Sequence, residues 1–97
     1  MDFFEKNMKD TLEAINNSID NNIFLINTKR IRKYHNINSS NRSKINFIWR
    51  ALRLLEERGV LIPNGATNPR SYKIKIRKPI DIIKYIENLD KGSTIKQ

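Results

Sequence analysis

The amino-acid sequence predicts a small α+β domain, in which helices pack around a β-hairpin. Apolar residues recur at helical spacing over residues 2–20 and again over residues 41–58. Polar and apolar residues alternate with a period of two over residues 70–78, as they do in a half-buried strand. The chain has 97 residues, of which 38% are hydrophobic. This size and composition suit one domain over residues 1–90.

The positive charge is concentrated in the middle of the chain. The formal net charge is +9, and residues 28–78 hold fourteen Lys and Arg against two Glu, a sum of +12. Residues 1–27 hold two Lys against five acidic residues, and residues 79–97 hold three of each sign. This distribution favours a polyanionic partner, nucleic acid before membrane. A basic surface with no such partner is the alternative.

The composition also excludes several classes of site. The chain has no cysteine, so it has no disulfide and no thiolate metal site. The N-terminal residues do not resemble a signal peptide, and the longest apolar run is the four residues 23–26. We therefore expect a cytoplasmic protein with no cofactor, no membrane contact and no small-molecule ligand.

The first helix is expected over about residues 2–20. Its apolar stripe consists of Phe4, Met8, Leu12, Ile15 and Ile19. A turn at residues 20–22 ends this pattern. The apolar run 23–26 then predicts a brief strand.

A short second helix is expected over about residues 28–35. Asn27 or Thr28 can cap its start, because both side chains accept hydrogen bonds from free backbone N–H groups. Ile31 and Tyr34 are expected to face the core, while the basic residues between them face solvent.

The central helix is expected over about residues 41–58, and it ends before Gly59. Its core stripe consists of Ile45, Ile48, Leu52 and Leu55. Its polar side is expected to carry Arg42, Ser43, Lys44, Asn46 and Arg50. We expect Trp49 at the edge of the core, on the first helix or the hairpin, with a base-stacking platform as its alternative. We expect Phe47 to pack against the second helix, with contact to thymine methyl groups as its alternative.

A β-hairpin is expected over about residues 60–78. Turn dipeptides at 64–65 and 68–69 separate its two strands, so the loop is longer than a tight hairpin turn. Pro79 then suits the first turn of a last helix over about residues 80–89. The tail 91–97 is expected to be flexible.

This order of elements resembles that of the winged helix-turn-helix DNA-binding domains of small bacterial, archaeal and viral-type transcriptional regulators. The segment RALRLLEERGVL, residues 50–61, is similar to the end of the recognition helix and the entry into the wing in that family. The resemblance covers about residues 10–78, although the turn 36–40 lacks the glycine often found there. It implies a three-helix core with a short strand, a two-stranded β-hairpin wing and a C-terminal helix.

The resemblance also implies double-stranded DNA binding, with the helix 41–58 in the major groove and the wing at 63–70 on the backbone or minor groove. Arg42 and Lys44 would then donate to guanine edges, and Asn46 would pair with adenine. Phosphate contacts are expected from Ser39, Ser40, Ser43 and Arg50. The other expected contacts are Asn41 at the helix start, Lys29, Arg30, Arg32 and Lys33 on the second helix, and Asn64, Thr67, Asn68, Arg70 and Lys73 on the wing.

The leading hypothesis from the sequence is a sequence-specific, nucleoid-associated transcriptional regulator. A homodimer would place two recognition helices about one turn of DNA apart. The residues expected at its interface are Phe3, Phe4, Met8, Ile82, Tyr85, Ile86 and Leu89. The alternatives are an architectural DNA-binding protein of low specificity, a protein–protein adaptor on the same fold, and an RNA-binding protein.

Neither an enzyme nor a metal site is expected. His35 is the only histidine, and no second ligand or catalytic partner accompanies it in the sequence. The three glycines form no phosphate-binding loop, and Glu56 and Glu57 suit a solvated helix end better than a catalytic pair.

Overall fold

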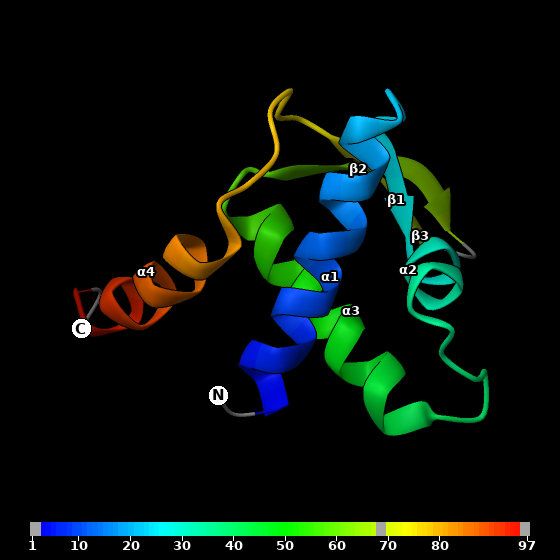
Figure 1. The fold of residues 1–97 in the computed structure, drawn as a ribbon, viewed down its shortest axis with the longest axis horizontal. Helices are drawn as coiled ribbons and strands as arrows, with labels where there is room; N and C mark the ends of the chain where they lie inside the picture. Colours follow the sequence, from blue (N-terminus) through cyan, green and yellow to red (C-terminus); the bar gives the residue numbers. More distant parts are fainter. Residues whose placement is uncertain (1–2, 68–69, 96–97) are drawn as a thin grey trace.

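The computed structural model describes the backbone of residues 3–67 and 70–95, and the side chains of residues 3–65 and 71–89. Over these residues the fold is α+β, with four helices and a three-stranded antiparallel sheet (Figure 1). The helices are α1 (Phe3–Asp20), α2 (Thr28–His35), α3 (Arg42–Glu57) and α4 (Ile82–Ile95). The strands are β1 (Leu25–Asn27), β2 (Leu61–Thr67) and β3 (Arg70–Ile74). Within the described ranges, every helix is too short or too polar to cross a membrane.

The sheet has the strand order β1-β3-β2, so the short first strand pairs with the end of the hairpin. Tyr72 of β3 lies between Ile26 of β1 and Pro63 of β2. Tyr72 and Ile26 are buried against the helices, whereas the neighbouring Lys73 is exposed on the opposite face. This alternation follows from the period of two in a strand, and it leaves one face of the sheet in solvent.

Helix α1 runs through the centre of the domain, with α2 and α4 on opposite sides of it (Figure 1). The core is formed mainly by α1, α3 and the inner face of the sheet, with further buried residues from α2 and α4. Its largest fully buried residues are Met8, Leu12, Ile15, Ile26, Ile31, Ile48, Leu52, Leu55 and Leu61. Most residues of the two predicted apolar stripes therefore lie in the core, as their spacing predicts, but Phe4 and Ile45 are only half-buried. Tyr34 is an exception, because its side chain is 50% exposed where an inward position was expected.

The first three helices end in the same way. Each is followed by a residue with positive φ: Asn22 at 61°, Asn36 at 57° and Gly59 at 80°. After α3, the N–H of Gly59 donates to the carbonyl of Glu56, and the next N–H donates five residues back, to Leu55. The same pair of bonds follows α1 and α2. Asparagine thus takes the role of glycine in the turn between α2 and α3, since it tolerates the left-handed conformation.

The hairpin differs from the sequence prediction. Strand β2 continues to Thr67 through Pro63, Asn64 and Gly65, with an irregularity in its pairing to β3 between Pro63 and Thr67. Much of the expected loop is therefore strand. This is compatible with Pro63 because β2 is an edge strand, where a missing N–H breaks no ladder bond.

Helix α4 also differs from the prediction, because it begins at Ile82 and continues to Ile95. Pro79 is not in its first turn, and the tail expected from residue 91 is helical as far as Ile95. The later start has a structural cause. The side-chain amide of Asn16 donates to the carbonyl of Ile80 at 2.9 Å and accepts from its N–H at 2.8 Å. Asp81 then accepts a hydrogen bond from the Lys84 N–H at 3.3 Å, as helix-capping residues do.

Candidate functional site

The solvent-facing side of α3 is the most distinctive polar surface of the chain. Its exposed residues are Arg42, Ser43, Asn46, Trp49, Arg50, Arg53 and Glu57. These positions are three and four apart, so they form one face of a helix with 3.6 residues per turn. Along the helix, this face carries three guanidinium groups and one amide before it reaches a carboxylate. That carboxylate belongs to Glu57 and lies 3.8 Å from Arg53. It can therefore donate many hydrogen bonds to an anionic partner.

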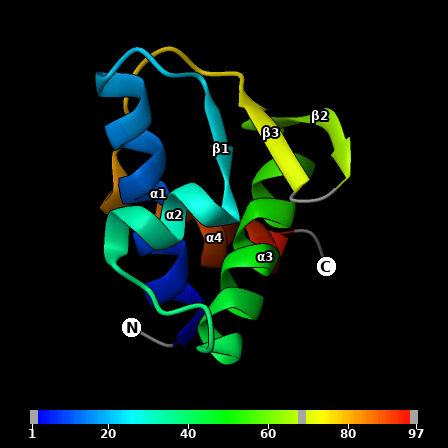
Figure 2. The ribbon, with the colours of Figure 1, turned by 90° about the vertical axis from the view of Figure 1, so that its right-hand side faces the viewer.

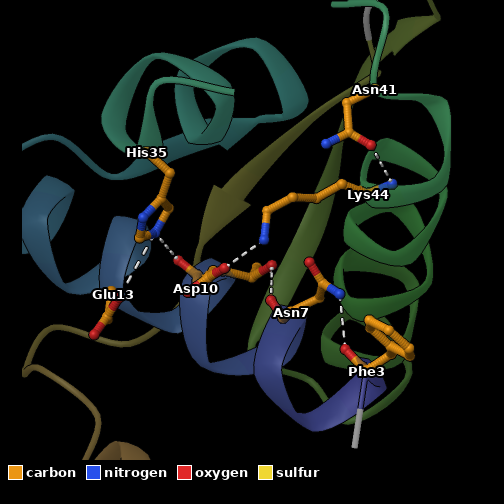
Figure 3. Close-up of polar contacts among 8 residues, drawn as sticks. Phe3, Asn7, Asp10, Glu13, His35, Asn41 and Lys44 are labelled. Atoms are coloured by element: carbon orange, nitrogen blue, oxygen red, sulfur yellow. Dashed lines mark hydrogen bonds and ion pairs between the residues drawn. The ribbon is translucent and has the colours of Figure 1, made fainter. Parts of the chain in front are cut away.

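Lys44 does not belong to this face, although it was predicted to read guanine. Its ammonium forms an ion pair with the Asp10 carboxylate of α1 at 2.7 Å (Figure 3). The two side chains are only 23% and 17% exposed. The helical spacing of Lys44 indicates this inward position. Lys44 precedes the buried Ile48 and Ala51 by four and seven residues, so all three lie on the same side of α3. In this structure Lys44 therefore joins α3 to α1.

Of the two aromatic residues of α3, Trp49 is not where it was expected, and Phe47 packs against a different helix. Trp49 is 59% exposed in the middle of the polar face, so its expected place at the edge of the core is wrong. Phe47 is half-buried, and its ring stacks on Phe3 of α1 with centroids 6.1 Å apart. The guanidinium of Arg50 lies 5.5 Å above the Phe47 ring. Phe47 thus packs as predicted, but against α1 instead of α2.

Helix α2 lies beside α3. In the view of Figure 2, α2 is in front and α4 lies behind α2. Lys29, Arg30 and Lys33 are exposed on α2. Asn27 caps this helix through a 2.7 Å hydrogen bond from the Arg30 N–H. Arg32 is only half-buried as a residue, but its Nε is buried and has no hydrogen-bond partner among the described residues. Three of the four predicted cations of α2 are therefore free to contact a partner.

The turn before α3 is organised by its own hydrogen bonds. The side chain of Asn38 accepts from both the N–H and the hydroxyl of Ser40, at 2.9 Å each. Asn41 caps α3 by accepting from the Lys44 N–H at 3.3 Å. Ser39, Ser40 and Asn41 are all exposed, so their remaining donors and acceptors are open to solvent.

The predicted hairpin residues are placed only in part. Asn64 is exposed on β2, and Lys73 is exposed on the solvent face of the sheet. Thr67 and Arg70 pair with each other at the end of the hairpin, where only their backbone is described. Asn68 lies outside the described residues.

A second polar cluster joins α1, α2 and α3. The Nε2 of His35 lies 2.7 Å from the backbone oxygen of Asp10 and 3.7 Å from a carboxylate oxygen of Glu13 (Figure 3). The ligand atoms of Asp10, Glu13 and His35 lie within 4.8 Å of one another. Asp10 and Glu13 could therefore supply the second ligand that the sequence did not show beside His35. However, Lys44 already neutralises Asp10, so a cation would have to displace its ammonium.

A shallow polar groove adjoins this cluster between α1 and α2, with a volume of about 550 Å³. Its lining residues are Glu13, Asn16, Asn17, Asp20, Tyr34, His35 and Ile82. Two of the lining residues are acidic, so the groove differs in charge from the exposed faces of α2 and α3. It does not extend the cationic surface.

The residues predicted at a dimer interface fall into two groups. Met8, Ile86 and Leu89 are at most 6% exposed, so they belong to the core of the chain and offer no surface to a second copy. Phe3 is 74% exposed, and Phe4, Ile82 and Tyr85 are half-buried. Ile83, which was not predicted, is 72% exposed on α4.

Searches of protein-family models, of curated proteins and of solved structures returned no match to this chain. Its function is therefore argued from its own residues.

Proposed function

We propose that this chain is a double-stranded DNA-binding protein of the winged helix-turn-helix class. In this proposal α3 enters the major groove, α2 lies near the phosphates, and the β2–β3 hairpin is the wing, on the backbone or minor groove. The protein acts as a sequence-specific transcriptional regulator, located in the cytoplasm with the nucleoid.

The observation that carries the proposal is the exposed face of α3. Arg42 can donate two hydrogen bonds to guanine, and Asn46 one turn later can pair with adenine. Arg50 and Ser43 flank them with donors suited to phosphates. The exposed cations of α2 add electrostatic attraction that does not depend on sequence. The order α2, a turn with an asparagine in the left-handed conformation, α3 and hairpin also supports this class.

The proposal is tested by selecting duplexes from a random pool and measuring their affinity by fluorescence anisotropy at two salt concentrations. Arg42→Ala and Asn46→Ala should each weaken binding to the selected duplex by about 1–3 kcal/mol and relax its preference at one position. Lys84→Ala is the matched control, because Lys84 is exposed on α4, which lies on the side of α1 opposite α2. Absence of binding to any duplex at low salt would refute the proposal.

A second candidate is an architectural DNA-binding protein of low specificity. It is favoured by the internal ion pair of Lys44, which removes one of the two predicted guanine contacts. Exposed cations also lie on and just after β3, outside the face of α3: Lys73, Lys75, Arg77 and Lys78. Similar affinity for selected and random duplexes, with loss of binding on substitution of these cations, would support this candidate.

We also propose that the regulator is a homodimer in which α4 contacts a second copy. The exposed Ile83 supports this, since a large apolar side chain in water is unfavourable. Phe3 at the start of α1 is a second candidate contact. In Figure 1 α4 lies on the side of α1 opposite α2, so a dimer through α4 would leave α2 free.

A further inference from the structure

Trp49 is the only tryptophan of the chain, and it occupies an unusual position. It is 59% exposed, whereas Ile48 beside it is fully buried. Phe47, the other aromatic residue of α3, has an intramolecular stacking partner in Phe3. A large indole left in water contributes little to folding, and such residues often mark binding surfaces.

The position of Trp49 on the helix makes it central to the proposed DNA surface. It lies three residues after Asn46 and four residues before Arg53, so both side chains are its neighbours on the helix face. Arg42 lies on the same face two turns earlier. The only large apolar group of this face is therefore surrounded by hydrogen-bond donors.

In a major groove the indole would meet base edges that differ in chemistry. Most of the groups exposed there are hydrogen-bond donors and acceptors, and the 5-methyl group of thymine is the apolar one. Contact with that methyl group removes apolar area of both partners from water. A stacking contact is not available in an intact duplex, because the base faces are covered by their neighbours.

We propose that Trp49 is a specificity-determining residue that contacts a thymine methyl group. The preferred duplex then carries thymine opposite the middle of α3, between the bases read by Asn46 and those reached by Arg53. This inference rests on the proposed function, and it adds to it the base that α3 selects by apolar contact.

The test compares the selected duplex with the same duplex containing uracil in place of thymine, first throughout and then one position at a time. Uracil lacks the methyl group and keeps the base pair. Loss of the contacted methyl should weaken binding about fourfold. Trp49→Ala should bind the two duplexes equally. Arg53→Ala is the matched control from the same face: it should weaken both complexes and preserve the ratio between them.

The fluorescence of Trp49 gives a second readout in the unmodified protein, since no other tryptophan contributes. Its emission should change on binding to the thymine duplex, and change less with the uracil duplex. Thermal unfolding checks that Trp49→Ala is folded, as expected for an exposed side chain.

The outcomes separate this inference from the proposed function. Equal binding of thymine and uracil duplexes by the native protein, with binding still weakened in Asn46→Ala, overturns the role of Trp49 and retains the DNA-binding proposal. Absence of binding to any duplex overturns both. Tighter binding to single strands than to duplexes, with a change in Trp49 emission, indicates base stacking and also overturns the methyl contact.

Discussion

The ammonium of Lys44 and the carboxylate of Asp10 form an ion pair of 2.7 Å that joins α3 to α1. The backbone oxygen of the same Asp10 accepts a hydrogen bond from Nε2 of His35 in α2, at 2.7 Å. One residue of α1 therefore contacts both of the helices that are proposed to meet DNA (Figure 3). This ion pair joins α3 to α1 without using the exposed face of α3.

Substitution of Lys44 by Met should destabilise the protein and leave the base preference unchanged. It leaves the partly buried Asp10 without its partner, at a cost of about 1–2 kcal/mol. Urea unfolding measures this cost, and the Asp10→Asn/Lys44→Met double-mutant cycle isolates the pair. Arg42→Ala is the control, with little change in stability expected because its side chain is exposed. If Lys44→Met instead alters base preference at unchanged stability, Lys44 leaves Asp10 in the complex.

Asn36 should tolerate glycine better than alanine. Its φ of 57° lies in the left-handed region, where a Cβ is unfavourable unless the side chain compensates. We expect Asn36→Gly to be nearly neutral and Asn36→Ala to cost about 1 kcal/mol, as measured by thermal or urea unfolding. Asn88→Ala on α4 is the matched control and should not destabilise, because its backbone is helical. Equal effects of alanine at both positions would contradict this account of the turn.

Lys33→Ala should weaken binding to all duplexes to the same degree. An exposed lysine of α2 that neutralises one phosphate adds about one to the steepness of log K against log salt, so its removal should reduce that steepness by about one. Anisotropy titrations over a series of salt concentrations measure this slope. Lys84→Ala removes the same charge from α4 and should not change it. An altered base preference in Lys33→Ala would place this residue on base edges instead.

Stability should fall at alkaline pH through Tyr85. Burial raises the pKa of its phenol above the usual 10.0, and the nearby Arg58 guanidinium opposes this shift. The unfolded chain therefore loses the phenol proton at a lower pH than the folded chain. The free energy of unfolding is unaffected by this group below pH 10.0 and decreases as the pH rises above that value and through the folded-state pKa.

Tyr85→Phe should remove this alkaline loss. It should also be neutral or stabilising near pH 7, because the buried Tyr85 hydroxyl has no hydrogen-bond partner among the described residues. Urea unfolding at neutral and alkaline pH tests both points. The control is Tyr34→Phe, since Tyr34 is 50% exposed. A native-like alkaline decrease in Tyr85→Phe would assign the effect to other groups.

Ile83→Glu should convert the proposed dimer to a monomer. Its side chain is 72% exposed, so the substitution does not disturb the core. Size-exclusion chromatography with light scattering at micromolar concentration measures the mass. Ile62→Glu, at a 44% exposed position on the sheet, is the control and should remain dimeric. A monomeric native protein under these conditions would refute the dimer.

The helices could be read from the sequence because their signals are local. The apolar stripe of the first helix and its asparagine-rich end lie within one continuous segment, and the structure has α1 at Phe3–Asp20. The same holds for α3, whose cap at Asn41 and left-handed Gly59 adjoin its ends. Spacing and capping depend on neighbours along the chain, so no tertiary knowledge is needed.

The parts that were predicted wrongly depend on residues distant in the sequence. Lys44 pairs with a residue 34 positions away, and a lysine on its own resembles a surface residue. The start of α4 depends on hydrogen bonds between Asn16 and Ile80, which are 64 positions apart. The exposure of Trp49 depends on how α3 is rotated against α1, and Phe47 takes the packing position beside Phe3.

The sequence by itself determined the order of helices and strands, the approximate ends of the first three helices and the concentration of positive charge in the middle segment. These follow from periodicity, capping and composition, which are properties of short stretches of chain. Only the tertiary structure decided which polar residues are free to bind. It joined Lys44 to Asp10 and left Trp49 exposed between Asn46 and Arg53 on α3. The reason is that a side chain becomes available to a ligand only when no other part of the fold covers or pairs it.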